Sequence, residues 1–190
     1  MVRILLALLA CCSLAGCWMS GERIFQDGDW AHLDLNGDYT SYGANGDVEG
    51  RVVLRTRANG LIESTSTDLD DGKVEHSVLG LVPIEGGSGS YFLTVDRMDD
   101  TAEGDLYFIT HLTEGGALEL YWPDCGGTPP MDGLKIEHDS IVDDVCNFSS
   151  RAALMRAGLE AERFLSAQHI VAVSPLGRIA PADEDDLEAE

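Results

Sequence analysis

Residues 52–65, VVLRTRANGLIEST, decide how this chain folds. In the first half, Val52, Leu54 and Thr56 alternate with side chains such as Arg55, the period of two that is typical of a strand with one buried face. The Asn-Gly pair at 59–60 is a strong signal for a type I′ hairpin turn, and a second strand-forming run follows it. The stretch therefore predicts two antiparallel strands joined by a tight turn.

Turn-forming residues recur on both sides of this hairpin. Glycine-rich or aspartate-rich breaks separate further strand-forming runs at 73–82, 90–96, 105–112 and 117–122. Short turns between neighbouring strands favour an antiparallel meander over a parallel βαβ sheet. We therefore expect a mainly β (α+β) fold with a meander of about seven or eight strands. The pattern leaves open whether the meander closes into a barrel or forms a half-rolled sheet.

One segment has helical patterning. Residues 151–167 contain no proline, and apolar side chains from Leu154 to Leu165 recur at helical spacing. Ser149 or Ser150 can cap the start of this segment. We expect a helix over about 150–167 that packs its apolar stripe on the sheet. A short strand at 169–173, ended by Pro175, is expected to follow it.

The charge balance limits the choice of partner. The chain has 190 residues, enough for one domain, with 12 Lys and Arg against 34 Asp and Glu and a formal net charge of −22. A surface of this charge repels phosphate backbones, which excludes nucleic acid as a partner. Residues 181–190 are mostly acidic and are expected to form a disordered tail.

The first residues have the organisation of an export signal. Arg3 precedes an apolar run at residues 4–10 that suits the core of a signal peptide and is too short to span a bilayer. The run leads to Leu-Ala-Gly-Cys at 14–17, which resembles the lipobox of bacterial lipoproteins. The resemblance implies that residues 1–16 are removed and that Cys17 becomes the first residue and carries acyl chains.

The same resemblance implies a location. Acyl chains contribute ~0.8 kcal/mol per buried CH₂, so several of them anchor a protein without a transmembrane helix. The expected location is membrane-anchored and periplasm-facing. Trp18 stands where an Asp would signal retention in the inner membrane, which slightly favours the outer membrane. We expect Cys17 and a tether at residues 17–28 to connect the membrane to a single β domain at 29–180.

Two cysteines remain beyond Cys17. In an oxidising compartment, the pair Cys125 and Cys146 predicts one disulfide. The alternative is a zinc site that also uses His111 and His138, but the spacing matches no common zinc pattern. We therefore favour the disulfide.

A second resemblance concerns the β domain. Gly28-Asp29-Trp30 matches the Gly-x-Trp motif of lipocalins near the first strand, and the order of strands and helix is similar in outline to lipocalin and calycin barrels. The resemblance implies a closed barrel that carries an apolar ligand in its interior. A second lipocalin signature, a Thr-Asp-Tyr-like turn with a later Arg, has no clear counterpart in the chain.

One segment resembles a calcium loop. Asp34, Asn36 and Asp38 offer oxygen ligands at alternate positions, as a dockerin or EF-hand loop does at its start. Tyr39 then occupies the place of the turn glycine, and Asn45 occupies that of the closing bidentate acid. We therefore favour a tight turn over a Ca²⁺ site at these residues, and we expect no cofactor.

Signatures of catalysis are missing from the sequence. It contains no Gly-x-Ser-x-Gly, no His-Glu-x-x-His and no phosphate loop. The five histidines are scattered singly, which is more typical of structural than of catalytic histidines. A site built on His111 or His138 beside acidic residues stays open as an enzyme hypothesis, but no catalytic residue is assigned.

These observations favour a lipid-anchored protein of the bacterial envelope whose β domain is a non-catalytic binding or interaction module. Its expected partners are the membrane, through the acyl chains on Cys17, and an unknown envelope protein or an apolar ligand. The alternatives are a lipocalin-like carrier, a divalent-cation binder and an enzyme with an unfamiliar site.

Overall fold

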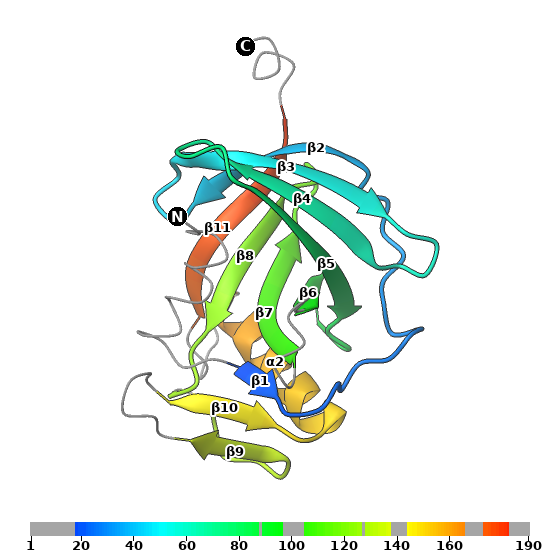
Figure 1. The fold of residues 1–190 in the computed structure, drawn as a ribbon. Coiled ribbons are helices and arrows are strands. Elements are labelled where there is room, and N and C mark those ends of the chain that lie inside the picture. The colour runs from blue at the N-terminus through cyan, green and yellow to red at the C-terminus, as the bar shows by residue number, and fades with distance from the viewer. Residues whose placement is uncertain are drawn as a thin grey trace.

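Backbone pairing closes the strands into an antiparallel barrel (Figure 1). The computed structural model describes residues 18–87, 89–96, 105–126, 128–137, 144–165 and 173–182. The barrel strands are β2 (Gly37–Gly43), β3 (Val48–Thr56), β4 (Ile62–Asp68), β5 (Val74–Pro83), β6 (Ser90–Asp96), β7 (Asp105–Leu112), β8 (Leu118–Pro123) and β11 (Val173–Pro181). The predicted strands at 90–96 and 105–112 are confirmed to the residue.

Closure depends on the last strand. Strands β2 to β8 pair in chain order, and β11 fills the remaining gap, with Ile179 opposite Leu118 of β8 on one side and Ser41 of β2 on the other. The meander is thus a closed barrel and not a half-rolled sheet. We expected Pro175 to end a strand at 169–173, but β11 runs through it; residues 169–172 lie outside the described part. A register shift between Pro175 and Gly177 accommodates the proline, which cannot donate to a regular ladder.

The hairpin predicted from residues 52–65 is confirmed as β3 and β4, with Thr56 opposite Ile62. Its turn differs from the predicted two-residue type I′ turn. The Arg57 amide donates to the Leu61 carbonyl and the Gly60 amide donates to the Arg57 carbonyl, so three residues form the loop. Gly60 has a φ of 87°, the left-handed conformation that closes such three-residue loops.

The inner faces of the strands form one apolar cluster. Alternation within each strand turns every second side chain inward, as with Leu106 and Phe108 of β7. The cluster fills much of the interior with large side chains. Its buried members are Leu35, Tyr39, Val52, Leu54, Ile62, Leu79, Leu81, Leu93, Leu106, Phe108, Leu118 and Trp122.

A second apolar cluster lies on the outer face of β5, β6 and β7. Val82, Phe92 and Ile109 point outward there and are covered by the chain before β2 and by helix α2 (Arg151–Leu165). The helix ends two residues before its predicted end. Ser150 caps its start, since the Ala153 amide donates to Ser150 Oγ at 3.3 Å. The predicted stripe is buried at Leu154, Ala157 and Ala161. The helix therefore packs outside the barrel.

Three short strands extend the sheet at one end of the barrel (Figure 1). They are β1 (Trp18–Ser20), β9 (Leu134–Glu137) and β10 (Val145–Phe148), and β1 lies between β7 and β10. Trp18 is only 1% exposed and packs edge-on against Phe148 at 5.2 Å between ring centroids. Ser20 Oγ lies 2.7 Å from the Tyr107 hydroxyl.

This arrangement corrects the predicted tether. Residues 17–28 have little apolar periodicity, but Trp18 and Phe25 are both buried against the barrel. A strand of three residues is too short to show a pattern, so sequence reasoning missed it. The leader at 1–16, Cys17 and residues 183–190 of the acidic tail lie outside the described residues. Among the residues that are described, no helix is both long and apolar enough to cross a bilayer.

Gly158 of α2 tests how closely the helix approaches the barrel. A Cβ at this position would lie 2.4 Å from the tip of the Phe92 ring, which is fully buried and held between Phe25 and Tyr107. Gly158→Ala improves helix propensity by about 1 kcal/mol, but overpacking of a fixed ring costs about 1–3 kcal/mol. We expect net destabilisation of about 1 kcal/mol, measured by urea unfolding. Arg156→Ala, at an exposed position of the same helix, is the control and should change stability little. A more stable Gly158→Ala protein would contradict the close packing.

Candidate functional site

A row of polar side chains crosses five neighbouring strands on the outer wall of the barrel. Strand register sets Tyr42 of β2 opposite Arg178 of β11, Arg178 opposite Glu119 of β8, Glu119 opposite His111 of β7, and His111 opposite Ser90 of β6. Directly opposed residues in antiparallel strands have Cβ atoms about 5 Å apart. We call these five residues the outer row.

Their outward direction follows from alternation along each strand. Leu118 and Leu120 on either side of Glu119 belong to the inner cluster or pack against it, and so does Ile179 beside Arg178. Because successive side chains in a strand point to opposite faces, Glu119 and Arg178 face solvent. Glu119 is half-buried and Arg178 is exposed.

The centre of the outer row carries opposite charges. The Arg178 guanidinium stacks over the Tyr42 ring, 4.4 Å from its centroid. On the other side, the Tyr121 hydroxyl donates to Glu119 Oε2 at 3.0 Å. Burial, and then the bond to Glu119, raises the pKa of Tyr121 to about 12, so its hydroxyl stays protonated at neutral pH and keeps donating to Glu119.

A depression of about 230 Å³ opens beside these groups. Tyr42, Glu119, Tyr121 and Arg178 line it together with the turn that follows β2. The turn contains Gly46, with a φ of 85°, so its backbone leaves the wall without a side chain to fill the depression. We call this depression the outer groove.

Ser90, His111 and Glu119 are the residue types of a hydrolytic triad, and His111 was the basis of the enzyme hypothesis. No hydrogen bond joins any two of them within the described part of the chain, and Glu119 accepts from Tyr121 instead. Ser90 is only 3% exposed. A nucleophile must contact its base and reach substrate, so this arrangement is not an assembled triad. His138 lies outside the described residues.

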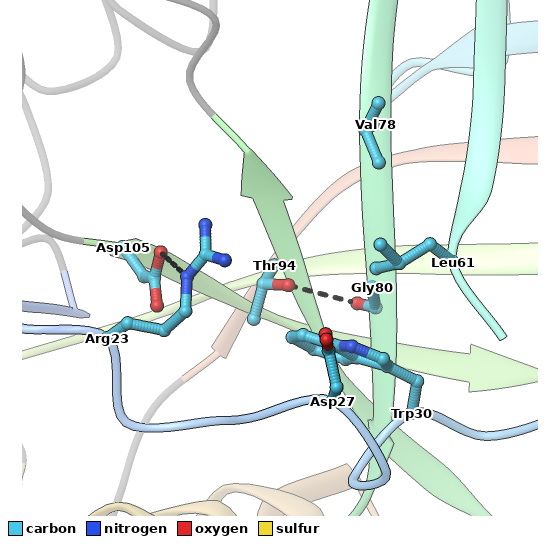
Figure 2. A pocket seen from close by; sticks show the side chains of 8 residues that line it. All are labelled: Arg23, Asp27, Trp30, Leu61, Val78, Gly80, Thr94 and Asp105. Carbon is cyan, nitrogen blue, oxygen red and sulfur yellow. Dashed lines mark hydrogen bonds and ion pairs between the residues drawn. The ribbon is translucent and has the colours of Figure 1, made fainter. Parts of the chain in front are cut away.

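The tryptophan of Gly28-Asp29-Trp30 lies on the wall of the barrel against Gly60 and Gly80. Figure 2 shows the small cavity beside it, where Arg23 pairs with Asp105 at 4.0 Å and Thr94 Oγ1 donates to the Gly80 carbonyl at 3.4 Å. The cavity holds about 30 Å³, roughly one water molecule, and the buried Trp30 Nε1 has no partner among the described residues. This motif therefore has a packing role.

Asp29 connects the segment before β2 to the helix. Its carboxylate accepts from the Gln26 amide at 2.8 Å and from Arg151, the first residue of α2. Arg151 also pairs with Glu85 at 3.0 Å and lies over the Phe25 ring. The Gln26 amide, followed by the Arg151 guanidinium, lowers the pKa of Asp29 below its ordinary value of 3.8.

The calcium-like residues are held within a turn. Asp34 Oδ1 accepts from Asn36 Nδ2 at 2.7 Å, and Asn36 Oδ1 accepts from the Thr56 amide at 2.9 Å. These bonds use two of the oxygens that a cation would need. Across the residues described, no group of three His, Cys, Asp or Glu side chains is arranged to hold a metal. The structure thus gives the proposed set Asp34, Asn36 and Asp38 no support as a Ca²⁺ site.

Cys125 and Cys146 are joined by a disulfide, with Cα atoms 5.4 Å apart and both residues fully buried. It ties the chain leaving β8 to β10. Sulfurs bonded to each other do not ligate zinc, so the zinc alternative is wrong for this pair. Cys17, the predicted lipidation site, lies one residue before β1 and outside the described part.

The barrel interior contains one polar group of interest. Thr110 of β7 is fully buried, and its hydroxyl has no hydrogen-bond partner among the described groups. Alternation places it on the inner face between Phe108 and Leu112. A water or a ligand atom would satisfy it.

Sequence reasoning singled out His111 but missed Arg178, Glu119 and Tyr121. They come from distant parts of the chain, and only the position of β11 brings them together. Comparison with known proteins adds no assignment: no family model, curated protein or solved structure matches this chain.

The depressed pKa of Asp29 predicts a pH effect. A carboxylate with a lowered folded-state pKa stabilises the fold above its unfolded pKa, and this contribution is lost as the pH falls from about 5 through the folded value. The destabilisation caused by Asp29→Asn should therefore be largest at pH 7 and shrink at low pH, measured by urea unfolding at each pH.

The control for this experiment is Asp27→Asn, an exposed carboxylate on the same turn. It should follow the wild-type pH profile. If the gap between Asp29→Asn and wild type were the same at every pH, the link to Arg151 and Gln26 would not contribute as described.

Proposed function

We propose that this chain is a lipid-anchored protein of the bacterial envelope, held by acyl chains on Cys17, whose periplasm-facing barrel is a non-catalytic binding or interaction module. The outer membrane is the favoured location. The barrel would meet its partner at the outer groove, where opposite charges and two tyrosines line an open depression.

Two observations support the anchored location. Residues 14–17 have the order of a lipobox behind a basic residue and an apolar core, and the Cys125–Cys146 disulfide suits an oxidising compartment. Neither depends on the fold of the barrel.

The position of β1 gives the anchor a structural consequence. Trp18 directly follows Cys17 and is pinned between β7 and β10, so little chain separates the acyl groups from the domain. Anchoring would hold this end of the barrel on the bilayer surface. Because this connection to the membrane is short, the barrel would sample a narrow range of orientations.

The outer groove is the observation that carries the binding role. Arg178 is exposed and the other charged and aromatic groups are half-buried, and they form stacking and hydrogen-bonding contacts with each other. Groups of this kind bind and orient a ligand. An enzyme built on His111 receives less support, because its neighbours Ser90 and Glu119 do not contact it by hydrogen bonds.

A lipocalin-like carrier is the second candidate. The closed eight-stranded barrel and the unpartnered Thr110 hydroxyl favour it. The large side chains of the inner cluster argue against a roomy apolar cavity, since an interior of eight strands is only just wide enough for side chains to fill it. The outer groove is therefore the better-supported site.

The anchor is tested by Cys17→Ser. Without the thiol there is no acyl attachment, so the variant should move from the membrane fraction to the soluble periplasmic fraction and should not incorporate labelled palmitate. Fractionation and labelling are measured on the same cultures.

Cys12→Ser is the matched control, because it removes a cysteine from the same leader but outside the lipobox. It should stay in the membrane and keep its label. Membrane-bound, labelled Cys17→Ser protein would overturn the anchor.

A further inference from the structure

Arg178 is one of three described cationic side chains, with Arg55 and Arg156, that form no ion pair within the described part of the chain. The chain has 34 Asp and Glu against 12 Lys and Arg, and most described cationic side chains pair with a carboxylate. Those pairs involve Arg23, Arg57, Lys73, Lys135, Arg151 and Arg163. Arg178 has no ion pair within the described residues, although Glu119 is its direct cross-strand neighbour.

The stack on Tyr42 explains why the pair does not form. The guanidinium lies over the ring on β2, so it is directed away from Glu119 on the opposite neighbouring strand. The stack also restrains the long side chain, so less conformational entropy is lost when an anion binds it. Arg178 is thus a preorganised site for a carboxylate at the edge of the outer groove.

On the other side of the outer groove, Glu119 can bind a cation. The Tyr121 hydroxyl holds the Glu119 carboxylate by a single hydrogen bond to Oε2. A carboxylate has about four lone-pair sites, so Glu119 keeps acceptor capacity for an ammonium group. The groove therefore presents a cation and an anion from neighbouring strands.

The net charge of the whole protein further limits the chemical class of the ligand. A net charge of −22 opposes the approach of any ligand that is negative overall, including phosphates and dicarboxylates. A ligand that is neutral overall pays no such penalty and still offers a carboxylate to Arg178. The depression, at about 230 Å³, is of the size of a small molecule.

We propose that the outer groove binds a small zwitterion of the α-amino acid class, with its carboxylate on Arg178 and its ammonium group on Glu119. The proposal rests on the binding role of the barrel and is independent of the anchor at Cys17. Glu119 of the groove is paired with His111 of β7, and Trp18 beside the anchor is paired with Tyr107 of the same strand. These two positions on β7 are four residues, or about 13 Å, apart. An anchored barrel thus leaves the groove accessible.

The experiment uses the full chain as cells process it, purified from membranes in detergent. Each common amino acid is tested singly by equilibrium dialysis at millimolar concentration. For the amino acid that binds best, the N-acetyl derivative and the amide are then measured. We expect at least tenfold weaker binding for both derivatives, because each lacks one of the two charges.

Variants assign each charge to its residue. Arg178→Gln should weaken binding of the amino acid at least tenfold, and Arg178→Lys should restore it only in part because lysine lacks the planar stacked group. Glu119→Gln should weaken the amino acid but not its N-acetyl derivative, so the preference between them disappears. Arg156→Gln, at an exposed arginine of α2, is the control and should bind as wild type does.

Three outcomes would overturn the proposal. They are no binding of any amino acid at millimolar concentration, binding that Arg178→Gln leaves unchanged, and acetate binding as well as the amino acid, which would indicate a plain anion site. In each case membrane attachment through Cys17 is unaffected, so failure of the ligand assignment is distinguishable from failure of the anchor.

Discussion

The barrel depends on one constraint: the free edges of β2 and β8 must both be paired. Hairpins carry the chain from β2 to β8 without closing the sheet, and unpaired backbone groups along two edges invite pairing with other chains. Strand β11 satisfies both edges at once, in antiparallel register with each. The chain between β8 and β11 therefore has to leave the barrel and return. It does so through β9, β10 and α2, with the disulfide closing the first part of this excursion.

The path of the chain between β8 and β11 determines which part of the outer wall is covered. Returning to the gap beside β2 carries α2 across β5 to β7, and Gly158 brings the helix close to Phe92. The segment before β2 covers the rest of this wall, with Trp30 against Gly80 and Asp29 on Arg151. On the other side of the barrel, where β2, β11 and β8 meet, Arg178 remains exposed among the described residues. The candidate site therefore lies on the wall that the described part of α2 and the segment before β2 leave accessible.

Much of this fold could be predicted from local sequence, because each hairpin is encoded within about twenty residues. The turn-forming breaks around 105–112, the turn at Asn59-Gly60 and the apolar stripe of α2 all indicated the correct elements. Strand β1 could not be predicted, since three residues carry no period and its pairing partners lie about ninety and one hundred and thirty residues away. The prediction that Pro175 ends a strand was wrong because a register shift lets β11 contain the proline. The outer row could not be predicted because it depends on the register of β11.

Charge is the remaining argument about function. In a protein with so large an excess of carboxylates, an exposed guanidinium has many available partners, yet Arg178 lies on Tyr42 and Glu119 bonds to Tyr121. Tyr42 holds the guanidinium and Tyr121 holds the carboxylate, so the two charges stay separate although they lie on neighbouring strands. Two opposite charges kept separate beside an open depression retain their capacity to bind, whereas a direct pair would satisfy both charges internally. The proposed recognition of a ligand by both of its ends requires such a separation of the two charges.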